Sequence, residues 1–133
     1  MVVDMDTVII SGKRYNEMDV VREKEEYVRL EAVDLCFALT RLIQDASPVV
    51  RAAVARKRVG HETLVADESW RVRATVAKYT NNEKYLEILA NDINEFVRFI
   101  VVKKGCCLES LKNDMDEEIA AIARNLLQNL ELA

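Results

Sequence analysis

Few side chains in this sequence could support catalysis. A run of carboxylates, NDMDEE at residues 113–118, could act as a general acid or base. Acidic residues at a helix start are also favoured by the helix dipole, and we prefer that structural interpretation. The single histidine, His61, follows Gly60 in a turn and has no partner visible in the sequence. We expect it to be solvent-exposed or loosely packed rather than functional.

The cysteines Cys36, Cys106 and Cys107 form an odd set with two adjacent members. This pattern does not indicate a disulfide framework, and no C-x-x-C motif is present. One histidine is too few for an ordinary zinc site, so we expect buried or half-buried small residues in a reducing cytosol. The sequence also lacks a nucleotide-binding loop and a G-x-S-x-G motif. We expect no enzymatic activity, metal, cofactor or small-molecule substrate.

Basic residues gather in the middle of the chain between two acidic ends, although the net charge is −4. The candidate binding residues among them are Arg56, Lys57, Arg58, Lys78 and Lys103. They could neutralise phosphates or meet an acidic protein surface. They could also simply complement helix dipoles and keep the surface soluble. All three interpretations stay open.

Trp70 and Arg71 are a second candidate feature. An exposed tryptophan beside an arginine is a common anchor for a protein partner. Packing of Trp70 against a neighbouring structural unit explains it equally well, and the choice stays open.

The elements that would position these residues come from a repeat. The segments DASPVVRAAVAR (45–56), DESWRVRATVAK (67–78) and DINEFVRFIVVK (92–103) share one pattern, and a degenerate fourth copy starts at Asp114. The four aspartates lie 22, 25 and 22 residues apart, each three residues after a leucine. Each is followed by apolar residues at helical spacing, namely Val50 and Val54, Val72 and Val76, Val97 and Val101, and Ile119 and Ile122.

Each copy predicts a helix with an aspartate N-cap and a basic last turn. Pro48 suits the opening turn of the first copy, where a missing N–H is tolerated. A polar turn and a short leucine-containing helix then lead to the next aspartate. Units of this size cannot bury an apolar face alone, so they should stack.

The pattern D-x(4)-V-R-x-x-V-A-[RK] resembles HEAT-like α-solenoids, and the short step is most similar to the leucine-rich repeat variant class. The resemblance covers about residues 42–127, and VRATVAKYTNNEKYLEILAND (72–92) is its best match. It implies an aspartate–arginine ladder between neighbouring units. The residues with that spacing are Asp45 and Arg51, Asp67 and Arg73, and Asp92 and Arg98. Ala120 replaces the arginine in the last copy, which suits a terminal cap.

The expected fold is therefore mainly all-α, a short α-solenoid of about four repeats of 22–25 residues with a small N-terminal β-hairpin. Ser11 and Gly12 mark the hairpin turn. We expect one helix from Glu17 toward Arg29 and another over residues 30–43. Residues 1–41 would form an N-terminal cap, and residues 42–133 the repeat body with a capping C-terminal helix, in one compact domain.

These patterns favour a non-enzymatic binding or adaptor protein. Trp70, Arg71 and the basic residues would meet a protein partner, and Arg56, Lys78 and Lys103 would align as a row on stacked units. The first alternative is a nucleic-acid binder that uses this row. The second is a small acidic inhibitor, of phage or mobile-element type, that occupies a basic site. No apolar run is long enough for a membrane span, and the acidic N-terminus does not resemble a signal peptide, so we expect a cytoplasmic protein that does not bind membranes.

Overall fold

The computed structural model describes residues 6–132. These residues are mainly helical, with ten helices that make up 61% of them and a two-stranded antiparallel sheet. The strands are β1 (Thr7–Ile10) and β2 (Lys13–Asn16). The outer helices are α2 (Glu26–Asp34), α4 (Pro48–Arg56), α6 (Trp70–Tyr79), α8 (Glu95–Lys103) and α10 (Glu117–Leu132). The shorter helices between them are α1 (Glu17–Arg22), α3 (Leu39–Leu42), α5 (His61–Leu64), α7 (Glu83–Leu89) and α9 (Leu108–Leu111).

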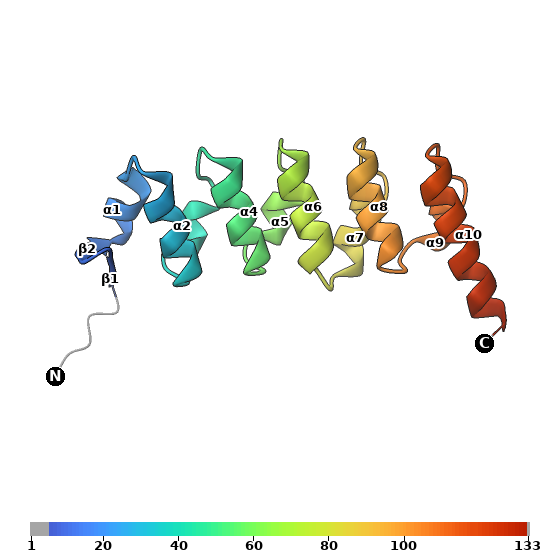
Figure 1. The fold of residues 1–133 in the computed structure, drawn as a ribbon, viewed down its shortest axis with the longest axis horizontal. Coiled ribbons are helices and arrows are strands. Elements are labelled where there is room, and N and C mark those ends of the chain that lie inside the picture. The colour runs from blue at the N-terminus through green and yellow to red at the C-terminus, as the bar shows by residue number, and fades with distance from the viewer. Residues whose placement is uncertain (1–5, 133) are drawn as a thin grey trace.

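The outer helices stand side by side in one row, with the hairpin at one end and α10 at the other (Figure 1). Along this row α2 packs on α4, α4 on α6, α6 on α8 and α8 on α10. We call each shorter helix and the outer helix that follows it a layer. The layers are α1–α2, α3–α4, α5–α6, α7–α8 and α9–α10. The prediction of a mainly helical chain with a small N-terminal hairpin is confirmed.

The hairpin closes through the predicted two-residue turn. Ser11 and Gly12 both have positive φ, at 52° and 79°, and the pairing runs from Ile10 opposite Lys13 to Thr7 opposite Asn16. Positive φ at both turn residues matches the twist of the strands. Ile10 and Tyr15 are buried, so the hairpin joins the core at the N-terminal end of the row.

The core is one continuous cluster of buried side chains along the row. Each of the last four layers contributes a fully buried leucine from its shorter helix, and these are Leu42, Leu64, Leu89 and Leu111. The outer helices contribute buried residues five and nine positions after the repeat aspartate, among them Val50 and Val54, Val72 and Val76, and Val97 and Val101. A layer buries these residues only against its neighbours, which explains the stacking.

The repeat aspartates are not the N-caps, which corrects the prediction. Ser47, Ser69 and Asn94 hold the N-cap positions of α4, α6 and α8. Each aspartate instead accepts the backbone N–H of the residue two positions later, as Asp45 does from Ser47 at 2.8 Å. The aspartate thus closes a turn ahead of the helix, because a second cap-forming residue follows it and begins the helix.

The expected helices over residues 17–29 and 30–43 are also wrong. The chain leaves the helix after Arg22, restarts at Glu26, and leaves again after Asp34, where Cys36 has a φ of 58°. Glu23 lies 22 residues before Asp45 and takes the place of a repeat aspartate. Its carboxylate accepts the backbone N–H of Glu25. The residues predicted to be a cap therefore contain a further layer.

The last layer differs from the sequence alignment by one residue. Ala123, nine positions after Asp114, is fully buried, whereas Ile122 is only half-buried. The sequence pattern aligned Ile122 with Val101 although the last copy is one residue short, and in the structure Ala123 takes that position instead. Ala120 is buried at the position where the other layers carry arginine.

Two glycines test how tightly the layers pack. Gly60 has a φ of 74°, and a Cβ there would lie 2.6 Å from Ile43 Cδ1, whereas Gly105 has a φ of 77° and open space around it. We expect Gly105→Ala to lower the free energy of unfolding by about 1–2 kcal/mol, the cost of a left-handed alanine. Gly60→Ala should lower it by about 1–3 kcal/mol more because of the clash. Urea unfolding of both variants measures the difference, and equal losses would contradict this packing.

Candidate functional site

Four arginine–aspartate pairs join the layers into a ladder. The ion pairs are Arg29–Asp45 at 2.7 Å, Arg51–Asp67 at 2.8 Å, Arg73–Asp92 at 2.7 Å and Arg98–Asp114 at 2.9 Å. Each arginine pairs with the aspartate of the next layer. In its own layer it donates to the backbone carbonyl six positions earlier, as Arg51 does to Asp45 O at 2.8 Å. Arg29 and Arg51 also donate to the carbonyl five positions earlier, at 3.3 and 3.2 Å. Each arginine therefore bridges two layers.

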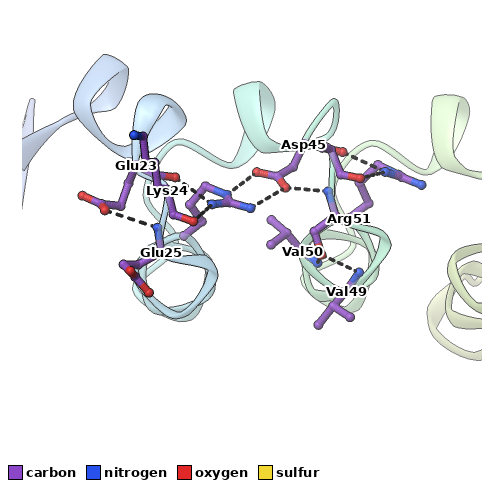
Figure 2. Close-up of polar contacts among 10 residues, drawn as sticks. Glu23, Lys24, Glu25, Asp45, Val49, Val50 and Arg51 are labelled. Atoms are coloured by element: carbon purple, nitrogen blue, oxygen red, sulfur yellow. Dashed lines mark hydrogen bonds and ion pairs between the residues drawn. The ribbon is translucent and has the colours of Figure 1, made fainter.

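Figure 2 shows the surroundings of Asp45, which accepts from a guanidinium of the preceding layer and from a backbone N–H of its own turn. The side chains of the four pairs are between 6% and 13% exposed. Two-point hydrogen bonding of this kind fixes orientation as well as distance. Because the carboxylate oxygens are occupied in this way, the ladder aspartates are structural residues rather than catalytic ones.

Sequence reasoning missed two members of the ladder. Arg29 pairs with Asp45 although no repeat was recognised upstream of Leu42. Asp114 receives Arg98, although it was placed only in the degenerate copy. The signal for Arg29 was available, because it stands six residues after Glu23, as Arg51 does after Asp45.

Removal of one ladder arginine should be costly. Arg98→Met leaves the buried Asp114 carboxylate without its partner, and we expect the free energy of unfolding to fall by about 3–5 kcal/mol. Arg41 and Glu17 form an ion pair on the surface, with side chains 51% and 45% exposed, so Arg41→Met should cost at most about 1 kcal/mol. Urea unfolding measures both, and similar small losses would show that the ladder is dispensable.

The ladder should also make stability depend on pH. Burial raises the pKa of Asp114, but the hydrogen bonds from Arg98 and from Asp116 N–H, with the Arg98 charge, hold it below its ordinary value. A carboxyl with a lowered folded-state pKa stabilises the fold above its unfolded pKa, about 4, and loses that contribution as the pH falls through the folded value. We expect Arg98→Met to lose less stability than the wild type between pH 6 and pH 3 in urea unfolding. An equal or larger loss would contradict this assignment.

An aromatic groove of about 610 Å³ lies between α6 and α8. We name it the α6–α8 groove, and it is lined by Trp70, Arg71, Ala74, Thr75, Lys78, Phe96, Phe99, Ile100, Lys103 and Lys104. Its lining combines aromatic and aliphatic side chains with four cations and, within the described residues, no carboxylate. This composition contrasts with the net charge of −4 of the whole chain.

The aromatic side chains of the groove contact one another across the layers. Trp70 meets Phe96 edge to face at 5.6 Å, and Phe96 stacks with Phe99 at 6.2 Å. Arg71 lies 4.6 Å from the centre of the Trp70 ring. Trp70 is half-buried and Phe96 is 49% exposed. Trp70 therefore packs against the next layer and also lines an open groove, so the geometry is compatible with both interpretations of this residue.

The basic residues fall into two groups. Arg56 and Lys103 are the last residues of α4 and α8, Lys78 is the residue before the last of α6, and all three are exposed. Across residues 6–132, none of them forms an ion pair with a carboxylate. We name these three residues the basic row.

The second basic group acts between layers. Lys57 donates to Asp34 O at 3.3 Å and Arg58 to Tyr79 O at 2.9 Å, so both cap the end of a neighbouring outer helix. Lys104 donates to Ala77 O, Lys78 O and Thr80 O at the end of α6. Burial, followed by the charge of Arg58, lowers the pKa of Lys104. These side chains satisfy helix-end carbonyls.

Phe96, Phe99 and Lys104 were not singled out from the sequence. Phe96 and Phe99 are spaced three residues apart on one helix face, seven and four positions before Lys103. That spacing could have indicated a surface shared with the basic row. The contact between Trp70 and Phe96 could not have been predicted in this way, since it joins residues of two different layers.

The remaining candidates for chemistry are structural. His61 is buried, with Nε2 2.7 Å from Ala55 O, so the expectation of an exposed or loosely packed histidine is wrong. It packs at the start of α5, where Nε2–H can satisfy a carbonyl at the end of α4. In the carboxylate run, Asp116 accepts the backbone N–H of Ile119, and Glu117 pairs with Arg124.

The three cysteines are free thiols at two places in the fold. Cys36 is exposed, whereas Cys106 and Cys107 are half-buried, with their Sγ atoms 2.8 Å apart. The expectation of burial is therefore wrong for Cys36, which the left-handed turn after α2 carries outward. Burial, with the hydrogen bond and charge of Cys106, raises the pKa of Cys107 to about 12, and a thiol with a raised pKa is a poor nucleophile.

Residues 6–132 contain neither a candidate metal site nor a candidate membrane span. No group of three or more histidine, cysteine or carboxylate side chains is arranged to hold a metal ion. No helix in this part of the chain is both long and apolar enough to cross a bilayer. Comparison of the chain with protein families, curated proteins and solved structures gave no match.

Proposed function

We propose that this protein is a short α-solenoid of the HEAT-like class that binds another protein and has no catalytic role. The shared repeat pattern, the row of layers and the repeated ladder support the solenoid assignment. The binding surface would be the face of α4, α6 and α8 that carries Trp70, Arg71 and the basic row. The free cysteines suit a reducing compartment such as the cytoplasm.

The observation that carries this proposal is the α6–α8 groove. It leaves Phe96 half exposed next to cations that form no ion pair with any carboxylate of the described residues. A monomeric protein gains nothing in stability from apolar surface left in contact with water. Aromatic side chains and arginine are the residues that most often dominate protein interfaces. A protein segment with an apolar side chain and negative charge would complement both properties.

Nucleic acid is the second candidate, because the basic row could meet phosphates and aromatic rings could stack on bases. The geometry favours protein. Arg71 lies over the Trp70 ring, and Phe96 packs between Trp70 and Phe99, so few ring faces are left free for bases. An acidic inhibitor has less support, because Asp114 and Asp116 are used in the ladder and in a helix start.

A peptide-library selection tests the proposal. Immobilised protein is panned with random displayed peptides, in parallel with the groove variant Phe96→Ala/Lys103→Glu and the control Ile88→Ala/Lys84→Glu. Ile88 is 54% exposed and Lys84 is also exposed, and neither lines the groove. We expect enrichment on the wild type and the control, and loss of the same peptides on the groove variant.

Two results would overturn the proposal. One is the absence of peptides that depend on the groove. The other is binding of labelled oligonucleotides, followed by anisotropy, that weakens steeply from 50 mM to 200 mM salt and disappears in the groove variant. The second result would make nucleic acid the preferred partner.

A further inference from the structure

We infer that the partner presents an acidic, extended segment that crosses α6 and α8, with an apolar side chain in the α6–α8 groove and carboxylates at Lys78 and Lys103. This inference rests on the proposed function and specifies the chemistry of the partner. Three observations carry it: the shape of the groove, its unbalanced charge and the spacing of its cations.

The groove has an apolar surface with positively charged side chains at its edge. Trp70, Phe96 and Phe99 form its aromatic part, and Ala74 and Ile100 add aliphatic surface. Its volume of about 610 Å³ falls in the size range of clefts that bind small ligands, so the open groove can accept an apolar side chain. Lys78 and Lys103 lie in the last turns of the two helices that border it. An apolar side chain that enters the groove therefore places its backbone close to both ammonium groups.

Among residues 6–132, no carboxylate forms an ion pair with the cations of the groove. The ammonium group of Lys78 lies 5.6 Å from the centre of the Tyr79 ring, and that of Lys103 lies 5.9 Å from the centre of the Phe99 ring. Lys104 adds a third positive charge that helix-end carbonyls hold in place. Like charges gathered without a counter-charge repel one another, and an anionic partner relieves that repulsion.

The cationic surface has defined limits. On α2 the residue equivalent to Arg56 is Asp34, and on α10 it is Asn125. The basic row therefore covers α4, α6 and α8 only. A matching partner carries negative charge over two or three layers rather than along the whole row.

The spacing of the layers predicts the spacing of the carboxylates. Packed helix axes lie about 8–10 Å apart, so equivalent lysines on α6 and α8 are separated by about that distance. A polyproline II segment advances about 3.1 Å per residue and returns to the same side every third residue. Carboxylates three residues apart therefore meet successive layers, and an apolar residue between them faces the groove.

Peptide pools of defined charge test this inference. Three nine-residue pools share random apolar residues other than tryptophan at their variable positions. The first has glutamate at positions one, four and seven, the second has glutamine there, and the third has its glutamates at positions one, two and three. Trp70 is the only tryptophan of the protein and lines the groove, so its fluorescence emission reports occupancy directly.

We expect the first pool to change Trp70 emission at a concentration about tenfold lower than the glutamine pool and the clustered pool. The double variant Lys78→Glu/Lys103→Glu should bind the first pool more weakly by a similar factor, whereas Lys84→Glu should bind it as tightly as the wild type does. Circular dichroism of each variant checks that the helices remain folded.

The outcomes separate this inference from the proposed function. Equal binding of the glutamate and glutamine pools, or insensitivity to the lysine variants, overturns the acidic segment but leaves a protein-binding groove. If the first pool does not bind while displayed peptides of other composition still do, the acidic segment is again overturned and the protein-binding groove is retained. An oligothymidine that displaces the first pool and binds more tightly overturns both, in favour of nucleic acid.

Discussion

Each outer helix from α2 to α8 is joined to the next by one arginine that holds a carbonyl of its own layer and the carboxylate of the layer that follows. Buried charges are costly to desolvate, and a buried pair adds less stability than its short distances suggest. Its larger effect is on the register between layers. The guanidinium can make both hydrogen bonds to the carboxylate only at one relative position and orientation of the two layers. The apolar core, rich in valine and leucine, would tolerate small shifts that the ladder does not.

A fixed register gives each repeat position a constant place on the molecule. Positions five and nine after the ladder carboxylate always enter the core, as Val72 and Val76 do in the middle layer. The eleventh position always lies at the surface, and in α2, α4, α6 and α8 it is at or next to the last residue of the helix. Residues far apart in sequence, such as Lys78 and Lys103, therefore become neighbours without any interaction between them. The surface can vary from layer to layer because the ladder and the core carry the fold.

The sequence predicted the helical class, the hairpin and the spacing of the ladder, because each depends on local chemistry that recurs. It did not predict the first layer, since Glu23 fills the place of an aspartate and the search relied on aspartate. The N-cap was predicted two residues too early. Aspartate and serine are both good N-cap residues, and the sequence does not show which of Asp45 and Ser47 begins the helix. The burial of His61 depends on Ala55 O, and the groove depends on a contact between Trp70 and Phe96. Neither contact has a signature in one stretch of sequence.

The positive charges show why composition alone is a weak guide to partners. Lys57 and Lys104 occupy the same repeat position, twelve residues after the ladder aspartate, and both donate to carbonyls that end the outer helix of the preceding layer. Lys103 precedes Lys104 by one residue, yet it extends to solvent beside Phe99. A shift of one position on a helix turns a side chain by about 100°, which separates lysines that support the fold from those that can meet a partner. The local field of the α6–α8 groove is thus positive in a chain whose net charge is −4, and an approaching molecule responds to the local field.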